Sequence, residues 1–494
     1  MPPADPSASS HPTGGPAGPH VVVIGGGITG LAAAHRLLEL AARDSQPVRV
    51  TLLEASGRVG GVFGTRDIAG YRVETGADSF ITNKPWALDL CLRLGLESRL
   101  IPTIARYRRS LVLHNGRPEP VPEGFQLLTP VKFGPIFRSP LFTWRGKLRM
   151  AAEWFLPRRR DESDESLGSF ARRRFGTEAF ERIIQPMVGG IYTADPDKLS
   201  MQATMERFVA HERETGSVIR GMRKEARAGQ IARDGASGAR YGLFASLATG
   251  MQELIDALAG RIQAAATLRL STRVTALARR TDQPGWRLTT TGPEGVPSEL
   301  TCDAVVVALP THAASPLLRD VAPNLAERLG SIEYASTAIV VSGHKLSDVT
   351  HPLDAFGLVI PRIERRRILA VSFTSRKFPG RAPEGCVQLR TFVGGAMQPE
   401  LLDQSDEAIQ SLVREELGEI LGVRGTPDFA VVARWNRSMP QYHVGHVRNI
   451  AQLESEAREL PRLALAGNAY HGVGLPDAIH SGEQAAERIS AELA

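Results

Sequence analysis

The chain has 494 residues, of which 42% are hydrophobic and 23% charged, an ordinary composition for a globular protein. This composition excludes a wholly disordered chain, a collagen and a coiled coil, and no stretch approaches the ~18 unbroken apolar residues of a membrane-spanning helix. The 59 Lys and Arg exceed the 53 Asp and Glu by only six, so the charge does not argue for a nucleic-acid partner. Three scattered cysteines without metal-like spacing indicate a reducing compartment and no metal site.

The N-terminal residues differ in composition from the rest of the chain. Residues 1–19 are Pro, Ala, Gly and Ser with almost no charged or large apolar side chain, so they cannot bury enough surface to fold. We predict a disordered tail over 1–19. Because no basic segment precedes an apolar one there, the tail lacks the pattern of a secretory signal, and we expect a cytoplasmic protein.

From residue 20 onward the pattern is that of a parallel α/β sheet. The run 21–24 is β-branched and unbroken, as a strand buried on both faces requires. A glycine-rich turn, a predicted helix over 31–40 and a strand over 48–53 complete a βαβ unit. Strands of the same type are predicted at 304–308 and 463–466. Because these segments lie far apart in the chain, other domains must be inserted between them.

The inserted regions differ from each other in pattern. Residues 85–240 are predicted to be mostly helical, with arginine-rich faces. Residues 335–435 contain several β-branched runs and are predicted to form a mixed sheet that carries the substrate.

The glycine-rich turn follows the GxGxxG pattern between a predicted strand and a predicted helix. Gly25 permits the tight turn, Gly27 lets the backbone approach a pyrophosphate, and Gly30 allows the helix to pack closely. The phosphates would lie at the helix N-terminus, where free N–H groups favour negative charge. Glu54, at the end of the next strand, would accept hydrogen bonds from ribose hydroxyls. The predicted contacts of the turn are Gly25, Gly27, Ile28, Thr29 and Gly30.

The residues after Glu54 extend this site. Residues 54–61 read EASGRVGG, in which a glycine pair follows Arg58 and Arg58 could bond a phosphate with two N–H groups. This extension and the segment 466–482 resemble the FAD-binding superfamily of amine oxidases and porphyrinogen oxidases. The resemblance implies FAD as cofactor and a helix beginning near Pro476 that stabilises reduced flavin. The further cofactor contacts that it implies are Ala55, Gly60, Gly61, Val274, Asn468, Gly472, Val473 and Gly474.

Several stretches are similar to one branch of this superfamily, the oxygen-dependent porphyrinogen oxidases. They include residues 170–176, residues 185–200 and the pattern MPQY at 439–442 followed by VGH at 444–446. The resemblance implies a six-electron oxidation of a porphyrinogen to a porphyrin in haem synthesis. Flavin N5 would accept a hydride in each of three rounds, and O2 would reoxidise the flavin and give H2O2. No catalytic acid or base is identified, because the pyrrole protons can leave to solvent.

The resemblance also suggests substrate contacts, each with a simpler alternative. Arg109 and then Lys84 are the candidate anchors for substrate propionates, against a role as solvated surface charge. Asp78 would contact the macrocycle N–H groups or cap a turn. Phe373 and Leu358 would sandwich the macrocycle or pack in the core. Coproporphyrinogen III, with four propionates, is slightly preferred over protoporphyrinogen IX, with two.

The expected fold class is α/β, a discontinuous Rossmann-type FAD domain with an inserted α+β substrate domain and a helical subdomain. Phe125, Phe133, Phe137, Phe142, Trp144, Trp154 and Phe155 alternate with basic residues, a pattern typical of a peripheral membrane surface or of an ordinary helical domain. We predict the FAD domain at 20–84, 243–312 and 450–494, the substrate domain at 85–108, 209–242 and 313–449, and the helical, membrane-facing subdomain at 109–208.

The sequence leaves the location and the partners of the protein partly open. A peripheral position on the inner face of the cell membrane is an alternative to a free cytoplasmic protein, and a ferrochelatase is a candidate partner. Two other functions also remain open. An amine oxidase or desaturase would share the fold, although only Tyr470 is in place for the aromatic pair of an amine oxidase. A flavin-bound porphyrin carrier without turnover is the second.

Overall fold

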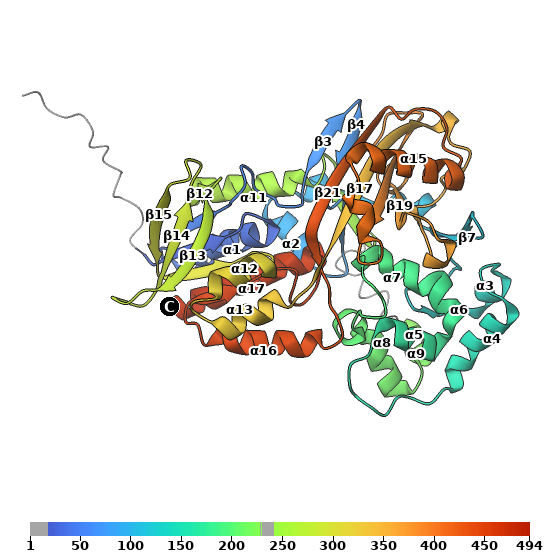
Figure 1. Ribbon diagram of the computed structural model, residues 1–494, viewed down its shortest axis with the longest axis horizontal. Coiled ribbons are helices and arrows are strands. Elements are labelled where there is room, and N and C mark those ends of the chain that lie inside the picture. Colours follow the sequence, from blue (N-terminus) through green and yellow to red (C-terminus); the bar gives the residue numbers. More distant parts are fainter. Residues whose placement is uncertain (1–17, 228, 230–241) are drawn as a thin grey trace, which may run out of the picture.

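The computed structural model describes residues 18–227, 229 and 242–494 (Figure 1). Most of the predicted tail, 1–17, lies outside the described residues, as do residues 228 and 230–241 of the predicted substrate domain. Among the described residues, no helix is both long enough and apolar enough to cross a lipid bilayer.

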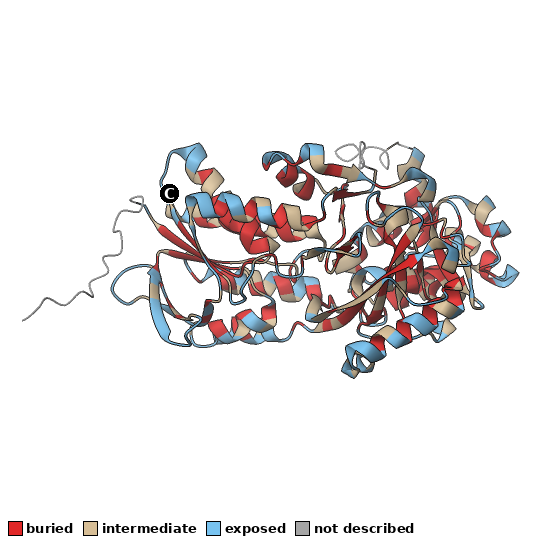
Figure 2. Ribbon diagram, turned by 90° about the horizontal axis from the view of Figure 1, so that it is seen from above, coloured by how far each residue is buried: buried red, intermediate tan, exposed pale blue. Residues whose placement is uncertain are grey.

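A five-stranded parallel sheet joins the segments that the sequence analysis assigns to one domain. Its order is β12 (Thr267–Arg269), β2 (Arg49–Leu53), β1 (His20–Ile24), β16 (Ala304–Val307) and β22 (Leu463–Leu465). Val21 pairs with Ala304 on one side and with Val50 on the other. Figure 2 shows these strands buried between helices whose outer faces are exposed. The predicted parallel sheet is therefore confirmed.

Helices cover both faces of this sheet. One face packs against α1 (Ile28–Asp44), α11 (Gln252–Ala265) and α17 (Leu475–Leu493) in one apolar core. The other face packs against α12 (Thr311–Leu318), α13 (Pro323–Gly330), α16 (His446–Arg458) and an antiparallel sheet. That sheet consists of β13 (Arg273–Arg279), β14 (Trp286–Thr291) and β15 (Pro297–Cys302).

The second large unit is a seven-stranded mixed sheet. Its order is β21 (Phe429–Pro440), β17 (Tyr334–Lys345), β20 (Cys386–Gly394), β19 (Ala370–Phe373), β18 (Gly357–Val359), β7 (Ser110–His114) and β8 (Arg117–Pro120). Helix α15 (Asp406–Leu421) packs on one face. The mixed sheet expected over 335–435 is thus present. The segment 109–208, expected to be helical, begins with β7 and β8 of this sheet, because β7 pairs with β18.

The helical part of the chain forms a separate core at the end of the molecule away from the parallel sheet (Figure 1). The substrate domain is predicted to include 209–242, but α8 (Met201–Thr215) and α9 (Val218–Arg227) share this core, since Phe208, Ile219 and Met222 belong to it. The remaining domain boundaries stay a prediction. The helices are α3 (Phe133–Arg138), α4 (Trp144–Ala151), α5 (Leu167–Phe175), α6 (Thr177–Ala179), α7 (Gln185–Tyr192), α8 (Met201–Thr215) and α9 (Val218–Arg227).

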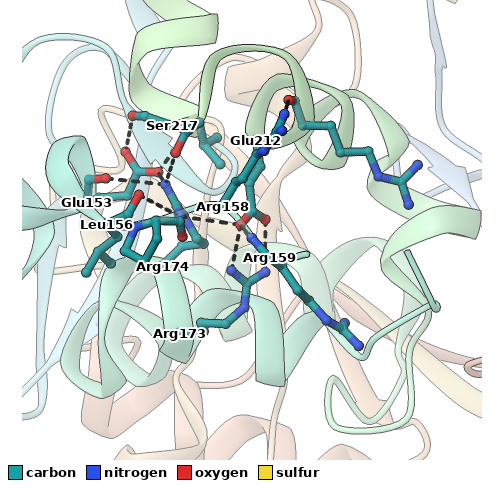
Figure 3. A network of polar contacts seen from close by, with 12 residues as sticks. Glu153, Leu156, Arg158, Arg159, Arg173, Arg174, Glu212 and Ser217 are labelled. Atoms are coloured by element: carbon teal, nitrogen blue, oxygen red, sulfur yellow. Dashed lines mark hydrogen bonds and ion pairs between the residues drawn. The ribbon is translucent and has the colours of Figure 1, made fainter. Parts of the chain in front are cut away.

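A buried ion network fixes these helices to one another (Figure 3). The Arg174 guanidinium of α5 donates to the Glu153 carboxylate at 2.9 Å, and both side chains are inaccessible to solvent. Glu153 also accepts from the Val218 N–H at 2.8 Å and from the Ser217 hydroxyl at 2.6 Å. Arg173 donates to Glu212 on α8 at 2.6 Å. Because every charge has partners, the network tolerates burial and sets the relative positions of α5, α8 and α9.

Short elements complete the described structure and link the two sheets. They are β3 (Thr65–Ile68) with β4 (Tyr71–Glu74), the sheet of β5 (Phe80–Ile81), β11 (Phe244–Leu247) and β6 (Leu100–Pro102), the pair β9 (Phe125–Gln126) and β10 (Thr129–Pro130), and the helices α2 (Trp86–Arg93) and α14 (Thr374–Lys377).

Helices α1 and α17 approach so closely that only glycine fits at their contact. A Cβ atom on Gly482 would lie 2.2 Å from the Thr29 carbonyl oxygen. We therefore expect Gly482→Ala to lower the free energy of unfolding by about 2 kcal/mol, as overpacking does. Thermal or urea unfolding measures the change.

Gly260→Ala is the matched control, because a Cβ atom at this α11 position would meet nothing within 4 Å. We expect it to raise stability by about 0.5 kcal/mol through the better helix propensity of alanine. Equal effects of the two substitutions would contradict the proposed close contact.

Candidate functional site

The glycine-rich turn between β1 and α1 leaves open space at Gly27. Gly25 has a φ of +108°, and its Cβ atom would lie 2.4 Å from the Ala308 carbonyl oxygen. A Cβ atom on Gly30 would lie 1.9 Å from the Gly25 carbonyl oxygen. A Cβ atom on Gly27, in contrast, would meet nothing within 4 Å. Gly25 and Gly30 are thus required by the protein's own packing, whereas Gly27 faces open space.

The loop 58–61 lies against this turn. The Gly60 N–H donates to the Gly26 carbonyl at 2.8 Å, and a Cβ atom on Gly61 would lie 3.5 Å from the Gly27 Cα. The Arg58 guanidinium donates to the carbonyls of Gly61 at 2.7 Å and Phe63 at 2.8 Å. Arg58 therefore holds the loop, and its contact with a phosphate remains a prediction.

Glu54 lies beside the turn at the end of β2, as predicted. Its carboxylate accepts from the N–H groups of Gly26 and Ser56, each at 2.7 Å. These bonds orient the carboxylate and leave lone pairs for ribose hydroxyls. Ala55 is exposed next to it. The N–H of Thr272 donates to the Glu54 carbonyl at 2.8 Å, which brings the start of β13 and the buried Val274 to this edge.

The C-terminal segment forms a second glycine-rich loop at the start of α17. Gly474 is the N-cap residue of α17. Tyr442 donates its hydroxyl proton to the Asn468 carbonyl at 2.5 Å, and Val473 packs against the helical core. Lys84, predicted as a substrate anchor, forms an ion pair with Asp477 in the first turn of α17, with 2.6 Å between Nζ and Oδ1.

These residues fit an FAD. The open space at Gly27, the carboxylate of Glu54 and the glycine-rich loop 472–474 come from three distant segments. They supply free backbone N–H groups for phosphates and a carboxylate for a ribose. The individual cofactor contacts remain predictions.

Asp78 is held between two cations. Its carboxylate lies 3.4 Å from Lys377 Nζ and 3.6 Å from Arg390 Nη1, and the Ser79 hydroxyl donates to it at 2.9 Å. Burial alone would raise the pKa of Asp78, but Lys377 and Arg390 hold this pKa below its usual value. Asp78 is therefore ionised at neutral pH. Its contact with a macrocycle remains a prediction.

A cavity of about 880 Å³ opens between strands β7, β8 and β11 and the helical part. Arg108, Arg109 and Arg138 line it together with apolar residues that include Phe125, Met187, Leu243, Phe244 and Phe356. Phe244 also contacts Lys377, whose Nζ is 5.0 Å from the ring centroid. Phe244 of the cavity wall thus contacts a lysine that pairs with Asp78, and the wall combines apolar residues with three arginines and Glu123.

Arg109 lines this cavity as the prediction requires, although it is paired. Its guanidinium donates to the Asp354 carbonyl at 2.8 Å and forms an ion pair with the Asp354 carboxylate. Both side chains are about half exposed, so an added carboxylate could bind the remaining N–H groups.

Four basic residues near the site were not identified from the sequence. Arg108 directly precedes Arg109 in the chain, and Arg138 belongs to the aromatic and basic stretch attributed to a membrane surface. Lys377 and Arg390 reach Asp78 from a sequence separation of about 300 residues. Of these four residues, only Arg108 has a local sequence signal, because it directly precedes the predicted anchor Arg109.

The predicted role of Leu358 and Phe373 as the walls of a macrocycle site is wrong. Phe373 pairs with Leu389 in the sheet, and Leu358 pairs with Val371. All four side chains enter the core under α15. Arg390, the next residue after Leu389, points to the opposite face, where Asp78 lies. Because side chains alternate between the two faces of a strand, Leu358 and Phe373 face away from the site.

Comparisons with known proteins agree with this site. A family model for flavin-containing amine oxidoreductases matches residues 28–490. The protein belongs to this family. Its members bind a flavin, and FAD is the cofactor of this oxidoreductase.

Individual relatives show which members of the family this chain is similar to. The coproporphyrinogen III oxidase of Bacillus subtilis (strain 168) is 37% identical over 94% of this flavin oxidoreductase and 97% of its own length. The chloroplastic protoporphyrinogen oxidase of Nicotiana tabacum is 30% identical over 98% of this chain and 88% of its own. A solved structure from Exiguobacterium sp. 255-15, assigned as a protoporphyrinogen oxidase, has a TM-score of 0.83 and 31% identity, with 97% of this chain and 100% of that chain covered.

Gly27 offers a direct test of the cofactor site in this flavin oxidoreductase. Because a Cβ atom at Gly27 meets no protein atom, we expect Gly27→Ala to leave the unfolding free energy of the FAD-free protein within about 0.5 kcal/mol of wild type. We expect the Kd for FAD to rise at least about tenfold, or 1.4 kcal/mol. Flavin fluorescence titration measures the Kd.

Gly30→Ala is the comparison, because its Cβ atom would collide with the Gly25 carbonyl. We expect it to destabilise the FAD-free protein as well. If Gly27→Ala bound FAD normally, the cofactor would not approach the turn at this position.

Proposed function

We propose that the protein oxidises a porphyrinogen to the porphyrin, removing six electrons with O2 as the final acceptor and H2O2 as its product, in haem biosynthesis. The observation that carries this proposal is the identity to porphyrinogen oxidases over nearly the whole chain. The large cavity supports it, since apolar walls suit a macrocycle and guanidinium groups suit its propionates.

When bound, FAD would supply the two-electron chemistry, which would be repeated three times per macrocycle. The chain's own residues bind and orient the substrate. Arginines at the cavity wall pair with carboxylates, and Phe125, Phe244 and Phe356 cover the ring and exclude water. Asp78 stays charged between Lys377 and Arg390, so it can accept a hydrogen bond from a pyrrole N–H but does not serve as a base at neutral pH.

Coproporphyrinogen III is the proposed substrate and protoporphyrinogen IX the alternative. The Bacillus subtilis relative with 37% identity is named for the first, and the tobacco relative with 30% identity is named for the second. Three arginines at one cavity also suit four propionates better than two. A ferrochelatase belongs to the same proposal as a partner, because the porphyrin product is a substrate for metal insertion.

Anaerobic mixing with each porphyrinogen tests the function. We expect the flavin absorbance to bleach and porphyrin fluorescence to appear, with the faster initial rate for coproporphyrinogen III. Air should then restore the flavin absorbance and generate H2O2. If neither porphyrinogen bleached the flavin, the proposed function would be wrong. A faster rate with protoporphyrinogen IX would change only the assigned substrate.

Arg109→Ala tests the carboxylate anchor. We expect KM to rise about tenfold, corresponding to the ~1.5 kcal/mol of one charged hydrogen bond, with little change in kcat. Arg117→Ala is the control, because Arg117 is exposed on β8 and is absent from the cavity wall. An unchanged KM in the Arg109 variant would remove Arg109 from the substrate site.

We also propose that the protein associates peripherally with a membrane. The helical part exposes Trp144 to 67%, Leu148 to 62% and Phe155 to 83% of their surfaces. Trp144 and Leu148 are four residues apart and share one face of α4, and Phe155 ends the 3₁₀ turn Ala152–Phe155 that follows α4. Exposed Arg138, Arg145, Arg158 and Arg160 flank them. An apolar face with a basic rim suits an anionic lipid surface.

The rest of the aromatic stretch has an ordinary structural role. Phe142 is buried in the helical core, and Trp154 packs under the guanidinium groups of Arg220 and Arg223. The proposed lipid contact is therefore limited to the exposed apolar side chains of Phe137, Trp144, Leu148 and Phe155 and their arginine rim.

Vesicle sedimentation tests this surface. We expect the wild type to bind vesicles with anionic lipid at low salt, and the double variant Trp144→Ser, Phe155→Ser to bind at least about tenfold less. Val296→Ser is the control, since Val296 is equally exposed but lies on the β14–β15 turn. Equal binding of all three proteins would contradict a membrane role for this face.

A further inference from the structure

The strongest unassigned feature is the ion pair between Lys84 and Asp477. Lys84 lies between β5 and α2, and Asp477 is the third residue of α17. The ammonium and the carboxylate are 2.6 Å apart, and the Asp477 side chain is only 13% exposed. Among the described residues, no other Lys or Arg forms an ion pair with Asp477. Its negative charge is therefore balanced by a single side chain.

The loop 472–474 wraps around the Asp477 carboxylate. A Cβ atom on Gly472 would lie 2.4 Å from Asp477 Cγ, and one on Gly474 would lie 2.9 Å from Asp477 Oδ2. Both positions have to be glycine for the loop to close over this carboxylate. The carboxylate consequently lies directly beneath the backbone that is predicted to contact the flavin.

The field of Asp477 reaches the buried surroundings of the loop. Burial raises the pKa of the Tyr192 hydroxyl to about 12, and the Asp477 charge adds to this increase. His480, one turn further along α17, stacks on Trp86 with 3.9 Å between ring centroids. Burial lowers the pKa of His480, so it carries little charge at neutral pH. Lys84 thus remains the charge that opposes Asp477.

We propose that the Lys84–Asp477 pair positions the loop 472–474 and sets the electron affinity of the bound flavin. The proposal deepens the proposed function, since it rests on the flavin lying at this loop. Reduction adds negative charge to the flavin. A nearby carboxylate opposes that charge, a nearby ammonium favours it, and an intact ion pair largely cancels both effects.

The proposal predicts opposite effects for the two partners. Lys84→Met leaves the carboxylate unbalanced, so the midpoint potential of the flavin falls. Asp477→Asn leaves the ammonium, so the potential rises. The double variant restores the balance and returns the potential close to that of wild type. A merely structural pair would instead weaken FAD retention in both single variants without opposite shifts.

The experiment uses the FAD-loaded protein without any porphyrinogen. Reductive titration against a reference dye gives the midpoint potential, and absorbance titration gives the Kd for sulfite, an anion that adds to oxidised flavin. We expect a change of about tenfold in the two-electron reduction equilibrium, which is about 30 mV, for each single variant and in opposite directions. Sulfite affinity should fall in Lys84→Met and rise in Asp477→Asn.

Two further variants keep the result interpretable. Lys84→Arg preserves the charge and should keep the potential near wild type even if Asp477→Asn fails to fold. Lys345→Met removes an exposed lysine distant from the loop and should change nothing. Shifts in the same direction, or no shift with FAD retained, would overturn the proposal. Because no porphyrinogen is present, failure of the proposed function in the anaerobic assay is a separate outcome.

Discussion

The close contact of α1 with α17 is the constraint on which the rest of the molecule depends. The Thr29 carbonyl occupies the place that a side chain at position 482 would need, so the first and last helices pack backbone to backbone. This contact holds the turn 25–30 and the loop 472–474 at the same edge of the parallel sheet. A cofactor site can form there although its parts lie about 450 residues apart.

Charge pairs then connect this frame to the other units. Asp78 follows β4 and belongs to the cofactor side, while Lys377 and Arg390 come from the seven-stranded sheet and its short helix. Lys84 and Asp477 join the same chain segment to α17. Both carboxylates are largely removed from solvent, where an unpaired charge would be costly. The Asp78 pairs therefore restrict how the seven-stranded sheet sits against the segment after β4, and the Lys84–Asp477 pair ties that segment to α17.

The cavity that Arg109 lines and the exposed apolar face share one structural unit. Pro135, Arg138 and Ser139 of the α3 region line the cavity, and Trp144, Leu148 and Phe155 follow directly in the chain. The ion network of Glu153, Arg174 and Glu212 fixes these helices to one another (Figure 3). A surface that contacts lipid would thus lie next to the entrance for an amphipathic tetrapyrrole. Arg138 belongs both to the cavity wall and to the arginine rim of this face.

The sequence by itself determined the parallel sheet, the glycine-rich turn, Glu54 and the FAD family, because these depend on local runs and on spacing within short segments. It also located Arg109 at the cavity. Only the tertiary structure decided which face of a strand meets the site. Strand register turned Leu358 and Phe373 toward α15 and Arg390 toward Asp78. Long-range packing gave Lys84 its partner Asp477 and brought Arg138 to the cavity wall. No local pattern encodes such pairings, since they arise only when segments hundreds of residues apart come together.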